Sequence, residues 1–348
     1  MFLQRFIRQR FRKHDLHIWL ATPWTHEEMS NEKIIMAQKP RILTWHIHGS
    51  YLYYLSQGAY ILYVPYTPER GPRYLGRGTT FPFGENVIEV PANEVRNLEL
   101  DLILFQCDEN YLEDQYMILS ELQQLLPKIY IEHDPPWHHP CDEIHPVTNP
   151  AVTLVHVTNF NSLMWKTNIP DVHVISHGVD THGVTYTGKL KKGIVVINNL
   201  PSRGRMLGSD IFEYVQKQVP LDLIGMDNAP YGNREVLHPQ LPEFIKDYRF
   251  FFNPIRYTSL GLAICEAMMV GLPVIGLATT ELSTVIENGK TGYLGLDVDE
   301  LITKMNMLLY DPLHAQQLSA HAQHKAQELF DITRFAQQWE YLINKKIN

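Results

Sequence analysis

The sequence predicts an α/β protein with two domains, each built around a mostly parallel sheet. Short runs of β-branched and aromatic residues alternate with amphipathic stretches along most of the chain, which is the pattern of repeated βαβ units. Several of these runs are apolar throughout, as expected for strands that are buried on both faces. The length of 348 residues suits two domains, each large enough to have its own core.

The expected strands fall on both sides of a polar segment at 180–192. Before it, strands are predicted at 41–47, 59–66, 86–90, 101–106, 128–132, 152–157 and 172–176. After it, they are predicted at 193–198, 221–226, 249–253 and 273–277. The stretches between them predict helices, for example at 110–126, 208–218 and 259–270. This number of strands is too large for one small open sheet, and we therefore expect two sheets.

The polar segment at 180–192 is predicted to link an N-terminal domain, 14–182, to a C-terminal domain, 190–330. After residue 297 the chain is predicted to be nearly all helical, and it ends with a helical segment at 331–348. Asp299, Asp311 and Asp331 stand near the starts of these helices. A short acceptor side chain at such a position can cap free backbone N–H groups, so we expect these residues to be N-caps.

Composition narrows the class of protein. Lys and Arg number 30 against 38 Asp and Glu, a net charge of −8, which argues against a protein that binds duplex nucleic acid. The three cysteines provide no disulfide framework and are typical of a reducing compartment, so we expect a cytoplasmic protein. Residues 260–280 are apolar enough to resemble a membrane span. Pro273, Gly271 and Glu266 within them favour a buried helix, a turn and a buried strand instead.

The first 13 residues carry five cations and no acid, and their apolar residues recur at helical spacing. Three interpretations remain open. The segment is a basic amphipathic helix that lies on an anionic membrane surface, a helix that packs on the rest of the protein, or a transit peptide or tail. No apolar stretch typical of a secretory signal peptide follows the cations.

The stretch from 249 to 270 predicts a ligand site. A strand runs into a turn and then into a helix that starts near Ser259. Open α/β sheets bind ligands at the carboxyl ends of their strands, and a helix N-terminus suits a pyrophosphate. Gly261 would let the backbone approach the ligand closely. Glu266 lies within an otherwise apolar helix and needs a partner, either ribose hydroxyls or a core tyrosine or backbone group.

This region resembles the signature of retaining GT-B glycosyltransferases of the family-4 type, the group 1 glycosyl transferases. The matching residues are Gly261, Glu266-Ala267-Met268, Gly271, Pro273-Val274-Ile275 and the turn 287–292. Residues 174–180 resemble the segment that ends the first domain in that family. The resemblance implies a GT-B fold, with two Rossmann-like domains, a cleft between them and a C-terminal helix, 331–348, that packs back on the first domain. It also implies a nucleotide-sugar donor and neither a cofactor nor a metal.

Two departures from the family concern the donor site. The family usually has two glutamates eight residues apart, and Thr258 stands at the first position while Glu266 stands at the second. The usual arginine after the first strand of the second domain is absent, and Arg203 and Arg205 are the candidates to hold the diphosphate. Alternatively, Arg205 is a solvated cation in a loop. The full set expected to bind the donor is Gly49, Ser50, Arg203, Arg205, Thr258, Ser259, Leu260, Gly261 and Glu266.

The first half of the chain supplies the remaining candidates. Residues 46–50 follow a strand, so Gly49 and Ser50 are expected to face the cleft, with His48 on the acceptor side and His46 in the core. His133, at the end of another strand, resembles the family's histidine beside the reacting carbon, and we expect it to be catalytic together with Glu266. Asp134 and Trp137 are assigned to the acceptor side. Prolines interrupt the His, Cys and Asp residues at 133–145 and their spacing fits no zinc template, so we expect no metal site there.

The resemblance implies a glycosyltransferase that moves a sugar to a glycan or lipid-linked acceptor with retention, in the synthesis of a cell-surface polysaccharide or lipopolysaccharide. An anionic membrane on the cytoplasmic side is a candidate partner for residues 1–13. The departures at Thr258 and Asn199, where the family has a glutamate and an arginine, leave an alternative open, a non-catalytic GT-B protein that binds nucleotide or glycan as the partner of another transferase. An epimerase or phosphorylase on the same fold is a third interpretation.

Overall fold

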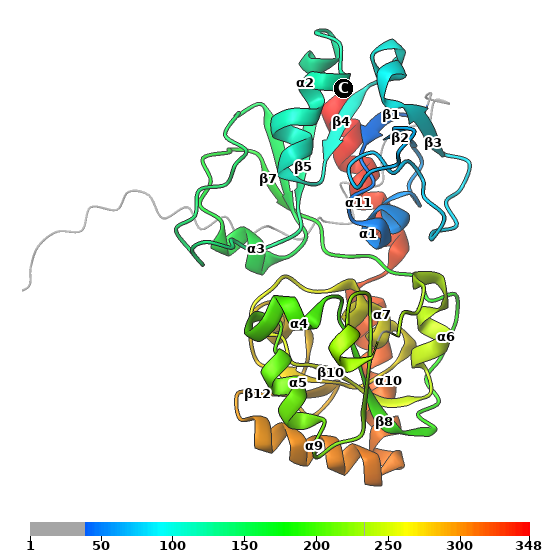
Figure 1. The fold of residues 1–348 in the computed structure, drawn as a ribbon, viewed down its shortest axis with the longest axis vertical. Coiled ribbons are helices and arrows are strands. Elements are labelled where there is room, and N and C mark those ends of the chain that lie inside the picture. The colour runs from blue at the N-terminus through cyan, green and yellow to red at the C-terminus, as the bar shows by residue number, and fades with distance from the viewer. Residues whose placement is uncertain (1–38, 233) are drawn as a thin grey trace, which may run out of the picture. The chain divides into compact units, whose positions relative to one another are not determined.

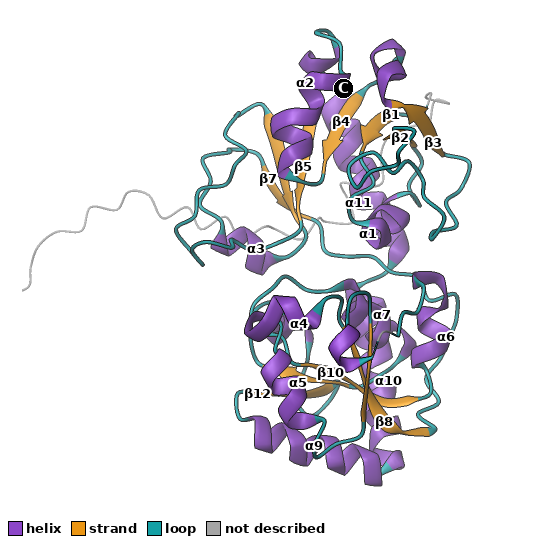
Figure 2. Cartoon of the chain, in the orientation of Figure 1, coloured by secondary structure: helices purple, strands orange, loops and turns teal. Residues whose placement is uncertain are grey.

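The computed structural model describes residues 39–232 and 234–348, so the hypotheses about residues 1–13 lie outside the described residues. In the described part, the alternation of strands and helices builds two separate sheets whose paired strands all run parallel (Figures 1 and 2). One sheet precedes the segment 180–189 in the chain and the other follows it. Each of the strands that the sequence predicts overlaps an observed strand.

The first sheet has seven strands in the order β3-β2-β1-β4-β5-β6-β7. Its central strands are buried along nearly their whole length, which is why their sequences lack an alternation of polar and apolar residues. The bounds are β1 (Arg41–Thr44), β2 (Ile61–Tyr66), β3 (Val87–Pro91), β4 (Leu102–Phe105), β5 (Lys128–Glu132), β6 (Val152–His156) and β7 (Val172–Val174).

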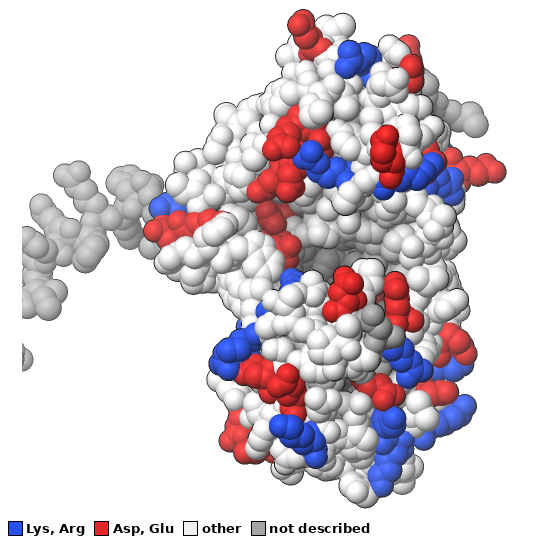
Figure 3. All heavy atoms as spheres, in the orientation of Figure 1, with Lys and Arg blue, Asp and Glu red and all other residues white. Residues whose placement is uncertain are grey.

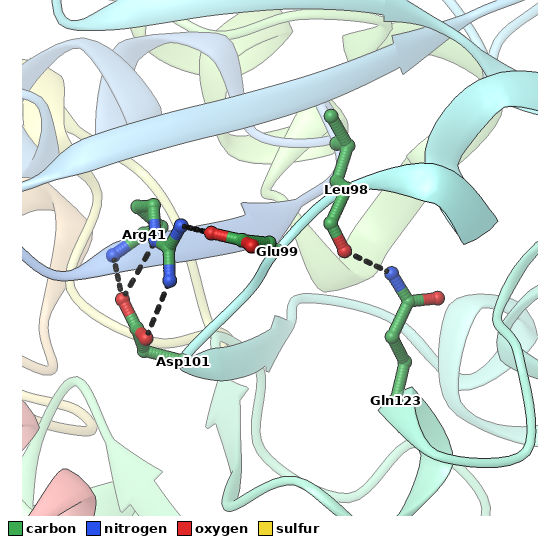
Figure 4. Close-up of polar contacts among 5 residues, drawn as sticks. All are labelled: Arg41, Leu98, Glu99, Asp101 and Gln123. Carbon is green, nitrogen blue, oxygen red and sulfur yellow. Dashed lines mark hydrogen bonds and ion pairs between the residues drawn. The ribbon is translucent and has the colours of Figure 1, made fainter.

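The amino-terminal edge of this sheet is fixed by polar contacts around Arg41 (Figure 4). The backbone N–H and the guanidinium of Arg41 both donate to Asp101, and the guanidinium also donates to Glu99 over 2.6 Å. These bonds join the start of β1 to the residue before β4. Nearby, the side-chain amide of Gln123 donates to the carbonyl of Leu98 over 2.8 Å.

The second sheet has five strands in the order β12-β11-β10-β8-β9. Its bounds are β8 (Leu190–Val196), β9 (Leu221–Ile224), β10 (Tyr248–Asn253), β11 (Val274–Leu277) and β12 (Gly292–Gly295). The sequence did not predict β12, because a four-residue run with glycine at both ends lacks the composition of a strand. Its pairing with β11 comes from tertiary packing, since a Cβ on Gly292 would lie 2.0 Å from the carbonyl oxygen of Val274.

Helices connect the strands, and three consecutive helices end the chain. Their bounds are α1 (Gly49–Leu55), α2 (Gln115–Ile118), α3 (Asn159–Met164), α4 (Leu200–Arg203), α5 (Ser209–Val215), α6 (Leu241–Ile245), α7 (Leu262–Val270), α8 (Leu282–Val285), α9 (Val298–Tyr310), α10 (Pro312–Leu329) and α11 (Ile332–Ile347). The interpretation of 260–280 as a buried helix, a turn and a buried strand is confirmed by α7 and β11. In the part of the chain that the structure describes, no helix is both long and apolar enough to cross a membrane.

Three predictions about helices were wrong in detail. The expected helix at 110–126 is broken into a π-helical turn at Asn110–Asp114, α2, and a 3-10 turn at Gln123–Leu125. Buried polar side chains in this stretch bond to each other and to the backbone, which competes with a continuous helix. The helix expected to start near Ser259 begins at Leu262. The N-cap of α9 is Asp297 rather than Asp299, while Asp311 and Asp331 cap α10 and α11 as predicted.

The last helix, α11, packs against α1 of the N-terminal domain, and Figure 1 shows the two side by side. Phe335 lies against Tyr51, with ring centroids 5.6 Å apart. On the same helix Trp339 and Leu342 are buried, whereas Tyr341 is partly exposed. Because α10 packs on α7 and α11 packs on α1, this C-terminal pair of helices contacts both domains.

Candidate active site

A cavity of about 1140 Å³ is lined by segments from the carboxyl ends of both sheets. This volume exceeds the roughly 300–1,000 Å³ of most small-molecule sites, so it can hold a ligand of nucleotide size. The N-terminal domain contributes residues after β1 and the long β2–β3 connection, and the C-terminal domain contributes residues after β8 and β9, the segment 235–241 and the start of α7. Of the predicted site residues, it brings together His48, Gly49, Ser50, Gly261 and Glu266.

Glu266 lies in the wall of this cavity and has protein partners. Its side chain is 2% exposed, and Oε1 accepts hydrogen bonds from Tyr54 Oη over 2.7 Å and from His238 Nε2 over 2.6 Å. Tyr54 belongs to α1 of the N-terminal domain, and burial together with the neighbouring carboxylate raises the pKa of its phenol. The sequence left a core tyrosine open as a partner of Glu266, and the structure shows that partner.

The helix that carries Glu266 begins at the cavity. Gly261 is the N-cap of α7 and is exposed, and a Cβ placed there would meet no atom within 4 Å. The three residues before it do not line the cavity. The carbonyl of Leu260 accepts from His177 Nε2 over 2.8 Å, and Ser259 Oγ is buried without a partner among the described residues. Thr258 is partly buried.

The opposite wall is formed by the start of α1. His48, Gly49 and Ser50 line the cavity, and a Cβ on Gly49 would lie 2.3 Å from the ring of Phe81. Burial lowers the pKa of His48 to about 4, so the imidazole is neutral near neutral pH. His46 is buried as expected, and its Nδ1 bonds to the carbonyl of Gly76 over 2.8 Å, but it also lines the cavity, which the expected core position did not include.

His133 lies one layer behind this wall. Its ring centroid is 4.0 Å from that of His48 and 4.6 Å from that of Tyr51. Nε2 is buried, and no hydrogen-bond partner for it occurs within 39–232 and 234–348. Burial and the neighbouring histidines lower the pKa of His133 well below its usual range. His133 does not line the cavity, whereas His48, its neighbour, does.

The remaining candidates form a cluster outside the cavity lining. Trp137 lies under the guanidinium of Arg203, with Cζ 5.8 Å from the ring centroid, and Tyr257 Oη donates to the carbonyl of Pro136 over 3.0 Å. Burial and the charge of Glu132 raise the pKa of the Asp134 carboxyl to about 6, while Arg203 opposes this shift. The guanidinium of Arg205 pairs with Asp210.

Three further residues were not found by sequence reasoning: Phe81 and His238, which line the cavity, and Tyr54, which does not line it but bonds to Glu266. Tyr54 appears in the sequence as one more aromatic residue of an amphipathic helix, and His238 as part of a His-Pro turn. Phe81 lies in the long β2–β3 connection, and its ring lies 5.2 Å from that of His238. A connection of this length without regular secondary structure is often functional. Its length alone could therefore have indicated that Phe81 lies near a binding site.

The charged side chains of the described residues form no group typical of a metal site, and they are of mixed sign on the face that Figure 3 shows. Within 39–232 and 234–348, no group of three His, Cys, Asp or Glu residues is arranged to hold a metal ion. On the face shown in Figure 3, acidic and basic side chains are interspersed. Arg70 is the only Lys or Arg among the described residues that line the cavity, and it forms two hydrogen bonds with Glu89.

Comparison with known proteins identifies the second half of the chain most clearly. Residues 227–311 match the family model described as group 1 glycosyl transferases. The trehalose synthase of Pyrococcus horikoshii is 33% identical over 84 residues, which are 24% of this chain and 20% of that protein. The trehalose synthase of Thermococcus litoralis is 36% identical over 84 residues, with the same coverage. The chain therefore spans only a fifth of the length of these curated relatives.

Solved structures match over more of the chain. Sucrose-phosphate synthase from Thermosynechococcus elongatus has a TM-score of 0.63 and 15% identity, covering 88% of this chain and 99% of that one. HepE from Anabaena, in complex with UDP-glucose, has a TM-score of 0.61 and 15% identity, with the same coverage. TarM has a TM-score of 0.57 and 15% identity over 73% of this chain and 57% of its own. These likenesses show the fold: the chain has the GT-B fold that its sequence predicts.

Proposed function

We propose that this GT-B chain is a glycosyltransferase that moves a sugar from a nucleotide-sugar donor to a glycan or lipid-linked acceptor with retention of configuration. The observation that carries the proposal is the cavity at the carboxyl ends of two parallel sheets, with buried Glu266 in its wall. Open α/β sheets bind nucleotides at this edge. The structural relative HepE was solved with UDP-glucose, and TarM with UDP and a glycosylated glycerol, which supports a nucleotide sugar as the donor.

The cavity divides into two walls with different proposed roles. Glu266 has a second carboxylate oxygen that can accept from ribose hydroxyls, and Gly261 leaves space at the start of α7 for the diphosphate. Gly49 and Ser50 approach the donor from the N-terminal domain. His48 faces the acceptor, and His133 is positioned behind it to stabilise the transition state together with Glu266. We assign Thr258, Ser259 and Leu260 to the donor side and Asp134 and Trp137 to the acceptor side.

The leaving diphosphate requires positive charge as the glycosidic bond breaks. We propose that the N-terminus of α7 and the guanidinium groups of Arg203 and Arg205 supply it, with no metal ion. Arg70 is a poor source of free charge, since two of its guanidinium nitrogens donate to Glu89. Arg203 and Arg205 would have to turn toward the cavity when the donor binds.

The acceptor and the place of the reaction are further parts of this proposal. We propose an acceptor of the cell surface, either a polysaccharide or a lipopolysaccharide precursor, presented on the cytoplasmic side of a membrane. The basic residues among 1–13 would hold the chain near an anionic surface. Deletion of 1–13 should then abolish co-sedimentation with anionic vesicles. Unchanged co-sedimentation would contradict this part.

A specific observation favours a second function. Thr258 replaces the glutamate that the family places first, and the described lining offers only one guanidinium, which is paired with Glu89. Both features fit a non-catalytic GT-B protein that binds a nucleotide or glycan as the partner of another transferase. Such a protein would bind nucleotide without releasing it from a sugar.

A thermal-shift screen with UDP, GDP, ADP, CMP and their sugars tests the proposed site. A ligand at about 100 times its Kd adds about 2.7 kcal/mol to the free energy of unfolding, which should raise Tm by several degrees. We expect one nucleotide to give this shift in the wild type and to lose it in Glu266→Gln. Glu281→Gln is the matched control, because Glu281 is also buried and also bonds to the N-terminal domain, at Phe160, but does not line the cavity. Equal shifts in both variants would contradict the site.

A further inference from the structure

Buried polar groups in the N-terminal domain surround the turn that carries His133 and Asp134. Glu132 is the last residue of β5, and its side chain is 10% exposed. Its Oε1 accepts from the backbone N–H of Asp134 over 2.8 Å, and its Oε2 lies 3.0 Å from His145 Nε2. Glu132 therefore connects the turn to a second buried side chain.

The contacts of His145 indicate its tautomer. Its side chain is fully buried, and Nδ1 accepts from the backbone N–H of Val147 over 3.1 Å. The proton of the neutral imidazole must then be on Nε2, which makes that nitrogen a donor to Glu132. The hydrogen bond has one direction, so Glu132 acts as an acceptor toward both His145 and Asp134.

Trp165 completes the arrangement from α3. It follows the last residue of that helix, and its ring lies across that of His145 with centroids 4.9 Å apart. Its indole N–H donates to the carbonyl of Asp134 over 2.8 Å. Both backbone polar groups of Asp134 are thus held, the N–H by Glu132 and the carbonyl by Trp165.

These bonds are placed where they control the candidate catalytic residues. The peptide units on both sides of Asp134 are fixed, and one of them joins it to His133. The ring of His133 has Tyr51 and His48 as neighbours, and no side chain bonds to its buried Nε2 in the described part of the chain. Its position therefore depends on the backbone that carries it. A buried glutamate and histidine are costly to desolvate, so we expect them to have a function beyond filling the core.

We propose that Glu132, His145 and Trp165 are positioning residues that hold the turn of His133 and Asp134 in place for sugar transfer. The inference rests on the proposed function. These residues do not contact the cavity, and they act through the backbone of the turn. Loss of one contact should lower the rate of the chemical step, because a small misplacement of a reacting group is costly, while the donor still binds to the C-terminal domain.

Trp165→Phe is the most discriminating variant, because it keeps an aromatic side chain next to His145 and removes the indole N–H together with the five-membered ring that carries it. We expect kcat for turnover of UDP-glucose, or of whichever sugar of the nucleotide panel the wild type uses, to fall about 10- to 100-fold, with KM for the donor little changed. The UDP-induced thermal shift should also stay unchanged. Tyr74→Phe is the control, since it removes one hydrogen bond of similar length, to Asp114, in the same domain but away from the turn.

His145 offers a test by conservative replacement. A glutamine can place an amide N–H where Nε2 lies and still donate to Glu132, whereas a leucine leaves the carboxylate without that donor. We therefore expect His145→Gln to retain more of kcat than His145→Leu. Equal kcat in the wild type, Trp165→Phe and Tyr74→Phe would overturn the proposal.

A second measurement does not depend on activity. Hydrogen exchange at the amide of Asp134 should accelerate about 10-fold or more in Trp165→Phe, while amides of the second sheet keep their rates. Unchanged exchange at Asp134 would overturn the proposal, as would an equal increase throughout the chain. A wild type that turns over no nucleotide sugar would contradict the proposed function, and the exchange result would still decide whether these contacts hold the turn.

Discussion

The two sheets present functional candidates at the same kind of edge but hold them in different ways. At the end of β5, the turn of His133 and Asp134 is held by Glu132 and Trp165, which belong to the same domain. In the second domain, Glu266 shares its Oε1 with His238 of its own domain and with Tyr54 of the other. The first arrangement is complete within one domain, whereas the second depends on the contact between the two.

Because of this difference, the turn of His133 and the carboxylate of Glu266 should respond differently to changes between the domains. A motion that separates Tyr54 from Glu266 alters the carboxylate proposed to bind the nucleotide. The two hydrogen bonds that hold the backbone of Asp134 lie within the N-terminal domain, although Arg203 and Tyr257 of the other domain also lie close to this segment.

The largest effect is expected from a glycine at the edge of the second sheet. Gly225, which follows β9 in the cavity wall, has φ of +138°, and a Cβ there would lie 2.2 Å from the carbonyl oxygen of Ile197. We expect Gly225→Ala to lower the free energy of unfolding by about 3 kcal/mol in urea titrations, because both the backbone angle and the close approach become unfavourable.

Gly261→Ala is the matched control at the same edge, because its added Cβ meets only open space. Its stability should change by less than about 1 kcal/mol, while its methyl group would weaken the binding of a diphosphate at the start of α7. Similar stability losses in the two variants would contradict this assignment of the glycines.

The next effect concerns Asp134 and is dependent on pH. Burial raises the pKa of its carboxyl from 3.8 to about 6, so the folded state binds this proton more tightly than the unfolded state. The free energy of unfolding should therefore fall as pH rises from about 4 to about 6, and the loss should be complete above that. Asp134→Asn removes the charge, so we expect it to be more stable than the wild type by about 1–2 kcal/mol near pH 7.5 and equal to it near pH 4.

Asp142→Asn, in the same loop, should change the free energy of unfolding in the opposite direction. Lys166 lowers the pKa of Asp142, so the charged form is favoured by folding and its loss should reduce stability near neutral pH. A gain of stability in Asp142→Asn would contradict the role of Lys166, and no gain in Asp134→Asn across the pH range would contradict the burial of the Asp134 carboxyl.

A smaller effect tests the contact between the domains. Tyr54→Phe removes the hydroxyl that donates to Glu266 and leaves His238 bonded to the same oxygen. The free energy of unfolding should therefore fall by about 1 kcal/mol. UDP should also bind about threefold more weakly in calorimetric titrations, because the carboxylate is less fixed. Tyr60→Phe loses a bond to the Leu55 carbonyl within the N-terminal domain and should leave UDP affinity unchanged. Equal UDP affinities in both variants would remove Tyr54 from the donor site.

The smallest effect on stability is expected at Arg205, which is exposed and paired with Asp210. Arg205→Ala should change the free energy of unfolding by less than about 0.5 kcal/mol. Arg203, beside Trp137, is the better candidate to reach the diphosphate, so Arg203→Ala should weaken UDP binding more than Arg205→Ala does. The reverse order would assign the diphosphate to Arg205.

Most of the fold could be predicted from the sequence, because the signals for strands and for helix starts lie within short stretches of the chain. Runs of apolar residues located the strands of both sheets, and the Asp residues before α10 and α11 located their starts. The short edge strand β12 and the broken segment 110–126 were not predicted, because their structure depends on packing against β11 and on buried polar side chains.

Only part of the site could be predicted from the sequence, because some of its contacts join residues that are far apart in the chain. Residues at the ends of strands or at the start of α7 reach the cavity as predicted, namely His48, Gly49, Ser50, Gly261 and Glu266. The partners of Glu266 could not be predicted, because Tyr54 is 212 positions away in the sequence and His238 is 28 positions away. The buried position of His133 behind His48 is likewise set by tertiary packing.

The most direct test of the proposed function is the release of nucleotide from a panel of UDP-, GDP-, ADP- and CMP-sugars by the wild type, Glu266→Gln and Glu281→Gln. We expect the wild type to release nucleotide from one class of donor, Glu281→Gln to match it, and Glu266→Gln to lose most of this activity. Binding of a nucleotide without release from any sugar would contradict the enzymatic function and support the non-catalytic alternative. Equal activity in the two variants would contradict the assignment of the site to Glu266.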